Sequence, residues 1–397
     1  MSHKKKIKNN IKFDIIVVGA GPAGIAFACG FVGTNIKVAI IDKLPREVIA
    51  NPKIDGREIA LTHHSVKILK KLNVWRYISN KSISVIKEAR VLDGDSKYFL
   101  NFDHQEIQKD CLGYLIPNHI IRKNLYKRLK NFPNITFINK TECLSVNINS
   151  QFASITLSNG KKIKTSLVVA ADSRFSKMRS KMGISAFTRD FNKNMIVCRM
   201  KHEKPHKNIA YEFFRYNQTQ ATLPYINNQS GIVTTATKDL ASILMRMDKK
   251  KFNKEMESRF NNFFGKMKLL GKRYSYPMVT TYTKKFISHR FAVIGDAAVG
   301  MHPVTAHGFN LGLKGLDILI DEIKAALKNK SDFGLTDILK NYQYKLHRVA
   351  APVYLATNSI INLYTSNILP AKLTRQFILR FVNTIKPVKQ TFLNILK

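Results

Sequence analysis

The sequence predicts an α/β fold in which a parallel-sheet unit is interleaved with an antiparallel sheet, and three observations support this prediction. Residues 13–41 have the pattern of an apolar strand, a glycine-rich turn, a helix of small residues and a second apolar strand. Residues 167–171 and 291–294 are further apolar strands, and an aspartate follows each of them. Residues 194–237 alternate and are rich in aromatic and β-branched side chains, which is typical of antiparallel strands. Since the two kinds of segment alternate along the chain, we expect interleaved domains.

Length and composition are those of a globular protein. The chain has 397 residues, of which 45% are hydrophobic and 23% charged, so it can bury more than one core and is not disordered as a whole. No apolar run reaches the roughly 18 residues of a membrane span, and the apolar run after the basic N-terminus is too short for a signal peptide. The 4 cysteines lack the spacing of a zinc site or a disulfide framework. We therefore expect a cytoplasmic protein without a metal.

The charge is strongly positive: 66 Lys and Arg against 26 Asp and Glu give a net charge of +40. A solvated surface, attraction to an anionic membrane and nucleic-acid binding would each fit such a charge. The lysines are dispersed, and no zinc finger, aromatic RNA-binding stripe or helix-turn-helix is evident, which argues against a specific nucleic-acid partner.

Helices are expected where apolar residues recur at helical spacing. The ranges are 57–76, 120–130, 251–271, 308–328 and, with interruptions at prolines, 335–397.

The first glycine turn, Gly19-Ala20-Gly21-Pro22-Ala23-Gly24, lies between a strand and a helix. In that context Gly19 permits a tight turn, Gly21 lets a pyrophosphate approach the backbone, and Gly24 allows the helix to pack on the strand. Asp42 follows about 20 residues later, where a carboxylate can accept hydrogen bonds from ribose hydroxyls. The alternative for Asp42 is a surface acid. This arrangement predicts a dinucleotide-binding unit.

Two later segments indicate which dinucleotide is bound. One is the strand that ends in Asp172-Ser173, and the other is Gly295-Asp296, followed by residues 301–303 and 308–312. Together with the first turn, they resemble the flavoprotein aromatic hydroxylases of the para-hydroxybenzoate hydroxylase type. The resemblance implies FAD as the cofactor, a Rossmann-like FAD-binding domain, an interleaved smaller antiparallel-sheet substrate domain, and C-terminal helices.

The resemblance also implies domain boundaries. They are a basic tail (1–11), an FAD-binding domain (12–80, 105–185 and 277–330), a substrate domain (81–104 and 186–276) and a C-terminal helical region (331–397).

Residues that match the FAD contacts of the family come from these three segments and from two further stretches, 55–61 and 113–122. They are Gly19, Gly21, Pro22, Ala23, Gly24, Asp42, Arg57, Asn118, Arg122, Asp172, Gly295, Asp296, Pro303, Gly308, Phe309 and Asn310. Asp296 is expected to hold the ribityl chain, and a helix starting near Gly308 would aim N–H groups at the region where reduced flavin is negative. For Asp296 the alternative is a helix cap, and for Arg57 and Arg122 it is a solvated charge. The family's usual glycine after the middle Asp is Ser173 here.

Within this family the sequence is most similar to the ubiquinone-biosynthesis hydroxylases, and to their bacterial 5-demethoxyubiquinol hydroxylase branch. The segments that carry this resemblance are 56–63, 170–176, 197–200 and 296–313. It implies an FAD-dependent monooxygenase that hydroxylates the ring of a polyprenylated phenol or quinol with O2 through a flavin C4a-hydroperoxide. The electron donor, NAD(P)H or another, and the hydroxylated carbon stay open.

The substrate site is expected under the antiparallel sheet. Candidate pocket residues are Tyr211, Phe213, Phe214, Tyr216, Leu223 and Pro224, for which ordinary sheet packing is the alternative. Pro303 would lie at the flavin face, and His302 and His307 could assist removal of a phenolic proton. Their alternative is packing in a glycine-rich loop.

Apolar and aromatic residues between 354 and 393, interspersed with Lys and Arg, predict either a peripheral face for the inner membrane or helices packed on the main domain. Other ubiquinone-biosynthesis proteins are expected partners if the resemblance holds. Two further functions stay open: a flavoenzyme acting on another aromatic or isoprenoid compound, and a non-catalytic basic scaffold with a relic FAD fold.

Overall fold

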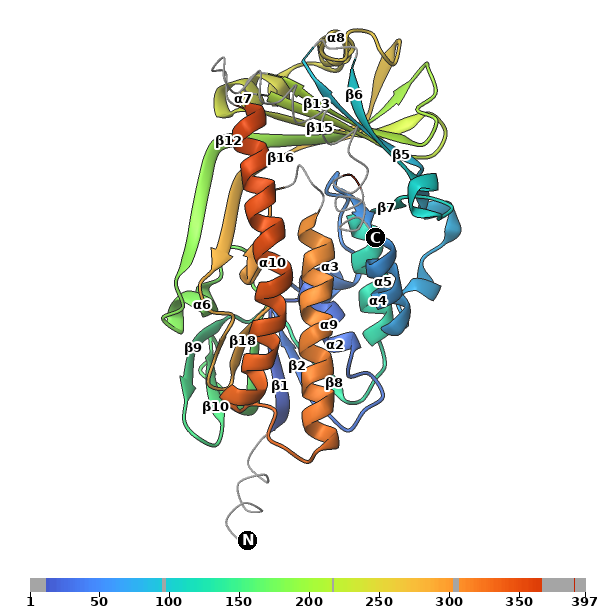
Figure 1. Cartoon of the computed structure of the whole chain (residues 1–397). Helices are drawn as coiled ribbons and strands as arrows, with labels where there is room; N and C mark the ends of the chain where they lie inside the picture. Colours follow the sequence, from blue (N-terminus) through green and yellow to red (C-terminus); the bar gives the residue numbers. More distant parts are fainter. Residues whose placement is uncertain (1–11, 95–97, 216–217, 303–306, 366–388, 390–397) are drawn as a thin grey trace, which may run out of the picture.

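The computed structural model describes residues 12–94, 98–215, 218–302, 307–365 and Lys389, and it has an α/β part and an antiparallel sheet at opposite ends (Figure 1). The α/β part is built on a sheet with the strand order β17-β18-β11-β1-β2-β8, of which β18 to β8 run parallel. The bounds are β17 (Ile287–Ser288), β18 (Phe291–Val293), β11 (Lys162–Ala170), β1 (Phe13–Val18), β2 (Val38–Ile41) and β8 (Ile135–Ile138), with β9 (Cys143–Ile148) and β10 (Ala153–Leu157) attached to β11.

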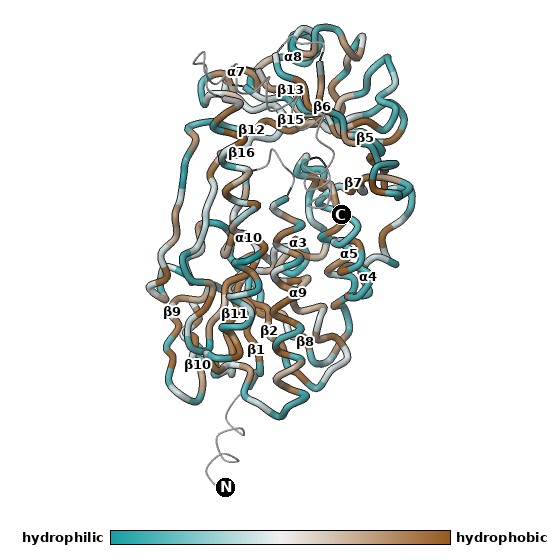
Figure 2. Tube along the Cα trace, in the orientation of Figure 1, coloured by the Kyte–Doolittle hydropathy of each residue, from teal (hydrophilic) through white to brown (hydrophobic). Residues whose placement is uncertain are grey.

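The central strands β1 and β2 are largely apolar, which is typical of parallel strands whose sheet is covered by helices. Every residue of β2 is buried, and Figure 2 shows β1 and β2 as predominantly hydrophobic. The helices of the molecule are α2 (Pro22–Cys29), α3 (Arg46–Ala50), α4 (His63–Lys71), α5 (Asn118–Leu129), α6 (Lys177–Lys181), α7 (Lys238–Arg246), α8 (Lys249–Arg259), α9 (His307–Lys328) and α10 (Thr336–Thr365). Short 3-10 turns are η1 (Trp75–Tyr77), η2 (Asn80–Ser82), η3 (His104–Ile107) and η4 (Gly295–Ala297).

The second large sheet has the order β19-β16-β12-β15-β14-β13-β5-β6 and is antiparallel except where β13 pairs with β5. Its strands are β19 (Val299–Gly300), β16 (Met267–Thr283), β12 (Ala186–His202), β15 (Gln229–Thr237), β14 (Gln218–Pro224), β13 (Ile209–Arg215), β5 (Glu88–Asp93) and β6 (Phe99–Asp103). A small sheet of β3 (Glu58–Leu61), β7 (Gly113–Pro117) and β4 (Ser84–Ile86) lies between the two. The predicted α/β class and the interleaving are thus confirmed.

Two predicted helices are partly wrong. Residues 57–76 begin as strand β3, because its residues pair with β7, and α4 starts only after Thr62, whose hydroxyl accepts a hydrogen bond from the Ser65 N–H at 3.2 Å. Residues 251–271 are helical only to Arg259. Left-handed backbone at Asn261, Asn262 and Gly265 ends the helix and turns the chain into β16.

The two faces of the antiparallel sheet bury different things. Its outer face packs against α7 and α8 in an aromatic core that includes Phe252, Phe260 and Phe264. Its inner face turns toward the α/β part, where Phe214 belongs to a second apolar cluster that the C-terminal end of α10 joins through Ile360. The space between the sheets is therefore bounded by side chains of the inner face.

Candidate functional site: a flavin nucleotide cradle

Three turns meet at the carboxyl ends of the neighbouring strands β1, β11 and β18. A Cβ added to Gly19 would lie 2.5 Å from the carbonyl oxygen of Ala171, and one added to Gly295 would lie 2.6 Å from the Cβ of Ala23. The turns near positions 21, 172 and 296 thus lie together in the structure, as the resemblance to an FAD-binding domain implies. The carboxyl edge of a parallel sheet is where open α/β folds bind nucleotides.

The first turn leaves room for a ligand only at Gly21. A Cβ on Gly24 would lie 2.0 Å from the Gly19 carbonyl oxygen, so that position is packed shut, whereas a Cβ on Gly21 would meet no protein atom within 4 Å. Gly21 precedes α2, no side chain caps this helix end, and Pro22 supplies no N–H group. The N–H groups of the first turn of α2 are therefore presented to the open side, where they suit a pyrophosphate.

Asp42 holds the first turn in shape. Its carboxylate accepts hydrogen bonds from the N–H of Ala20 at 2.6 Å and from the N–H of Leu44 at 2.8 Å. Each carboxylate oxygen has further acceptor capacity, so these bonds orient the group and are compatible with ribose hydroxyls at the same carboxylate.

In the middle turn, the Asp172 carboxylate is occupied by hydrogen bonds from the protein. Asp172 accepts hydrogen bonds from the Ser176 hydroxyl and from the N–H of Met178, which fixes the start of α6. The expected contact of Asp172 with the cofactor stays a prediction. The next residue, Ser173, has φ +88°, in the region that favours glycine. The structure thus gives a backbone reason for the glycine that the family usually has at this position.

The third turn places Asp296 beside Arg174. The two side chains form an ion pair at 2.8 Å, and Arg174 also donates to the Val279 carbonyl at 2.6 Å. The Asp296 side chain is 41% exposed, so its carboxylate remains accessible despite the ion pair. Gly312 lies on α9 close to this turn, where an added Cβ would be 3.6 Å from the Gly295 Cα.

A charged cluster borders the cradle at β3 and α5. Asp55 forms an ion pair with Arg57 at 2.6 Å and accepts a hydrogen bond from the Asn118 amide at 2.6 Å. Burial opposes the charge of Asp55, but Arg57 and Asn118 outweigh it and lower the pKa of this carboxyl. Arg122 lies near Asp42 and Asp55, burial lowers its pKa, and its buried Nε has no hydrogen-bond partner among the described residues.

The orphaned Arg122 nitrogen, the open space at Gly21 and the uncapped α2 together fit an anionic dinucleotide. Asp42 and Asp296 fit its hydroxyl-bearing parts. FAD is therefore compatible with the donors and acceptors of this cradle.

The start of α9 is tied to β3. The Asn310 amide donates to the Ala60 carbonyl at 2.8 Å and accepts from the Thr62 N–H at 3.1 Å, so Asn310 joins two walls of the site. His307 is the first residue of α9, and it is half-buried like Gly308 and Phe309. The contacts of these three residues and of Asn310 with the flavin stay predictions.

A pocket lies between the inner face of the antiparallel sheet and the segment after β19. It has an empty volume of about 340 Å³ and includes Phe191, Phe214, Met278 and His302 in its lining. Burial, followed by the nearby cations, lowers the pKa of His302 to about 3. His302 is therefore neutral at neutral pH and too weak a base to remove a phenolic proton efficiently.

The predicted pocket residues divide between the two faces of the sheet. Phe214 lines the pocket and Leu223 joins the inner apolar cluster, but Tyr211 and Phe213 belong to the outer core. The prediction was wrong for Tyr211 and Phe213 because alternate residues of β13 point to opposite faces. Pro224 is buried at the end of β14.

Two predicted residues, Pro303 and Tyr216, lie outside the described residues. Conversely, the sequence did not reveal Asp55, Arg174 or Met278. Asp55 directly precedes the recognised segment 56–63 and Arg174 lies within the segment 170–176, and these positions were the available signal for them.

Comparison with known proteins bears on the identity of this cradle. The model of the FAD binding domain family matches residues 12–356. The chain belongs to the FAD-dependent monooxygenase family. Ubiquinone hydroxylase UbiM of Neisseria meningitidis is 40% identical over 95% of this chain and 83% of its own length. Ubiquinone hydroxylase UbiL of Rhodospirillum rubrum is 30% identical over 96% of this chain and 88% of its own length.

Solved structures show the same fold at low identity. The p-nitrophenol 4-monooxygenase PnpA of Pseudomonas putida aligns with a TM-score of 0.78 at 13% identity, over 96% of both chains. PqsL of Pseudomonas aeruginosa, solved with 2-aminobenzoylacetate, aligns with a TM-score of 0.77 at 16% identity, over 89% of this chain and 97% of its own. These structures thus share the overall fold of this chain.

Proposed function

We propose that this protein is an FAD-dependent monooxygenase that hydroxylates the aromatic ring of a polyprenylated ubiquinone precursor. The single observation that carries the proposal is the 40% identity to a ubiquinone hydroxylase along 95% of the chain. The site supports it, because the structure holds a cradle that suits a flavin nucleotide and a pocket lined by residues of the antiparallel sheet and by His302. A demethoxyubiquinol-type ring is the substrate that we favour.

In this proposal the residues of the chain bind and orient the cofactor and the substrate, and they limit the access of water. The first turn of α2 and Arg122 hold the pyrophosphate, and Asp42 and Asp296 hold ribose and ribityl hydroxyls. When bound, FAD supplies the redox chemistry that activates O2 and inserts one oxygen atom into the ring. The inner sheet face lines the ring site with apolar side chains such as Phe214 and Met278, which limits the access of bulk water to the ring.

Product analysis tests the proposal directly. FAD-loaded protein is supplied with NADH or NADPH, O2 and a short-chain demethoxyubiquinol, and the products are identified by mass spectrometry. We expect one oxygen atom from O2 on the ring. Oxidation of the donor without an oxygenated product would contradict the proposal and favour a flavin oxidoreductase that acts on another compound.

A genetic test addresses the hydroxylated carbon. The gene is introduced into strains that each lack one ring hydroxylase of ubiquinone biosynthesis, and the accumulated quinone intermediates are identified. Restored ubiquinone in one of these strains identifies the ring position. Failure in all strains, with the protein expressed and flavin-loaded, would favour another aromatic or isoprenoid substrate.

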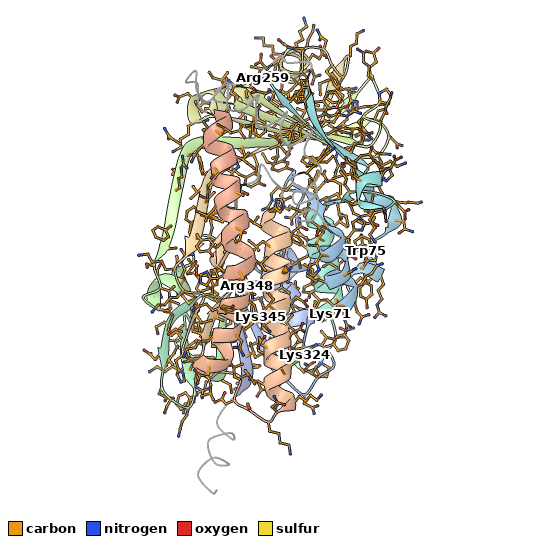
Figure 3. The ribbon with its side chains drawn as sticks, viewed as in Figure 1. Lys71, Trp75, Arg259, Lys324, Lys345 and Arg348 are labelled. Carbon is orange, nitrogen blue, oxygen red and sulfur yellow. The ribbon has the colours of Figure 1, made fainter. Side chains whose placement is uncertain are left out.

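Access to a polyprenylated substrate leads us to propose peripheral binding to an anionic membrane. The net charge of +40 and exposed apolar residues of α10 such as Leu355, 64% exposed, support such a surface. Figure 3 shows Lys345 and Arg348 on α10 and Lys324 on α9. None of the described helices is long and apolar enough to span a membrane.

Sedimentation with liposomes tests the membrane proposal. We expect the chain to sediment with vesicles containing phosphatidylglycerol at low salt and to be released at high salt. A chain that stays in the supernatant under both conditions would refute membrane binding. A partnership with other ubiquinone-biosynthesis proteins could then not depend on a shared membrane surface.

A further inference from the structure

One lysine lines the pocket under the antiparallel sheet. Lys193 belongs to β12 and shares the cavity wall with Phe191, Phe214, Thr235 and His302. The remaining described lining residues are uncharged, and His302 is neutral at neutral pH. Among the described residues, Lys193 is therefore the charged side chain of a wall that is otherwise apolar or weakly polar.

An irregularity in β12 places Lys193 there. The pairing of β12 with β16 shifts register between Asp190 and Asn194, and Asn192 within the shift has φ +54°. The residues in the irregular segment are free of the β12–β16 ladder, and Phe191 and Lys193 line the cavity. Bulges of this kind occur next to active sites, where they redirect side chains.

The described residues do not neutralise Lys193. Among the described residues no carboxylate lies within ion-pair distance of Lys193, and burial alone lowers its pKa. The nearest acid on its own strand, Asp190, pairs instead with Lys238 at 3.6 Å. A half-buried ammonium without a counter-charge costs free energy, which is typical of a group that awaits a ligand.

The other titratable groups described around the pocket do not supply the missing negative charge. Arg174 and Arg189 are further cations close enough to His302 to lower its pKa. Arg174 is paired with Asp296, and Arg189 lies over the Phe191 ring at 4.4 Å. On β13, burial raises the pKa of Glu212 to about 8, so that this acid is mostly uncharged at neutral pH. The pocket is thus positive and selects an anionic group.

We propose that the ammonium of Lys193 pairs with the phenolate oxygen of the aromatic substrate and so promotes its ionisation. This inference rests on the proposed function, which supplies a phenolic ring. The phenol O–H bond breaks, the proton passes to solvent water, and the electron pair stays on oxygen and spreads into the ring. The ring becomes more electron-rich toward the oxygen atom that it receives. Lys193 thus does by charge what His302 is too weak a base to do by proton transfer.

The bound phenol reports this interaction without turnover. FAD-loaded protein is titrated from about pH 6 to about pH 10 with 2-prenylphenol bound, and ionisation is followed by ultraviolet difference absorbance. Lys193→Met, which keeps the length of the side chain but removes its charge, is expected to raise the pKa of the bound phenol by about 1 to 2 pH units. Lys193→Arg should retain most of the wild-type value.

A matched control removes a charge elsewhere on the same strand. Lys201 is exposed on β12 and does not line the pocket, so Lys201→Met should leave the bound-phenol pKa unchanged. An unchanged pKa in Lys193→Met, with the phenol bound and FAD retained, would overturn the role of Lys193 alone. A wild-type holoenzyme that does not perturb or bind 2-prenylphenol would instead contradict the proposed phenolic substrate.

Discussion

The two halves of the site are made of different material. The nucleotide half is largely main chain: strand ends, glycine turns and the uncapped end of α2. The ring half is made of side chains from an antiparallel sheet and one irregular strand segment. A backbone cradle tolerates little added volume, whereas a side-chain pocket can change its ligand by single substitutions. The first half therefore defines the family, and the second is where members can differ in substrate.

The largest expected effect comes from adding a side chain at Gly24, where the nucleotide half of the site has no free space. Gly24→Val would place a Cβ 2.0 Å from the Gly19 carbonyl oxygen, so α2 would have to move off β1. We expect a loss of about 3 kcal/mol or more in stability and no bound FAD. Thermal unfolding and flavin absorbance of the purified protein measure both. A yellow protein of wild-type stability would show that α2 does not pack as described.

Gly21→Val separates ligand space from protein packing. Gly21 has φ −70° and ψ 176°, which any residue adopts, and its added Cβ meets no protein atom within 4 Å. We expect apoprotein stability to change by less than about 1 kcal/mol while FAD affinity falls roughly a hundredfold. Isothermal titration of apoprotein with FAD gives the affinity. If Gly21→Val and Gly24→Val lost the same apoprotein stability, the space at Gly21 would be filled by protein packing and would not be the pyrophosphate site.

Phe213 and Phe214, which are neighbours on β13, test the assignment of the two faces of the antiparallel sheet. Phe213 packs edge-on against Phe260 with centroids 5.5 Å apart, whereas Phe214 lines the pocket. Phe213→Ala should cost about 3 kcal/mol in urea unfolding with kcat/KM of the folded enzyme retained. Phe214→Ala should raise KM and cost less stability. Exchanged phenotypes would reverse the assignment of the two faces.

Sequence reasoning succeeded where function depends on short-range backbone geometry. The segments around Gly19, Asp172 and Asp296 each carry their strand and turn in consecutive residues, so their resemblance to one FAD-binding family could be recognised from the sequence. It failed where neighbours are distant in sequence. The face of Tyr211 depends on the register of β13 with β14, and Lys193 enters the pocket through an irregularity against β16. The strand at 58–61 was missed because its apolar spacing also suits a helix, and only pairing with β7 decides.

The burial of His302 in the pocket makes the stability of the protein depend on pH in the acid range. Its ordinary pKa is near 6.5 and burial lowers the pKa to about 3 in the folded protein, so the unfolded chain takes up this proton first as pH falls. Stability from this group is complete above about pH 6.5 and is lost toward pH 3, with up to about 2 kcal/mol gone at pH 5. His302→Gln should reduce the difference in urea midpoint between pH 7 and pH 5. If His302→Gln left the difference between the two urea midpoints unaltered, His302 would already be protonated at pH 5 in the folded protein.

The smallest expected effect lies at the middle turn, where this chain departs from its family. Ser173 adopts φ +88°, a conformation that glycine reaches without strain and serine does not. Ser173→Gly should therefore stabilise the protein by about 0.5 to 1 kcal/mol, after the greater flexibility of glycine in the unfolded chain is subtracted. Ser180→Gly, inside α6, is the control and should destabilise by a similar amount. Urea unfolding of both variants decides, because a Ser173→Gly protein less stable than wild type would mean that the hydroxyl stabilises the turn by more than the strain costs.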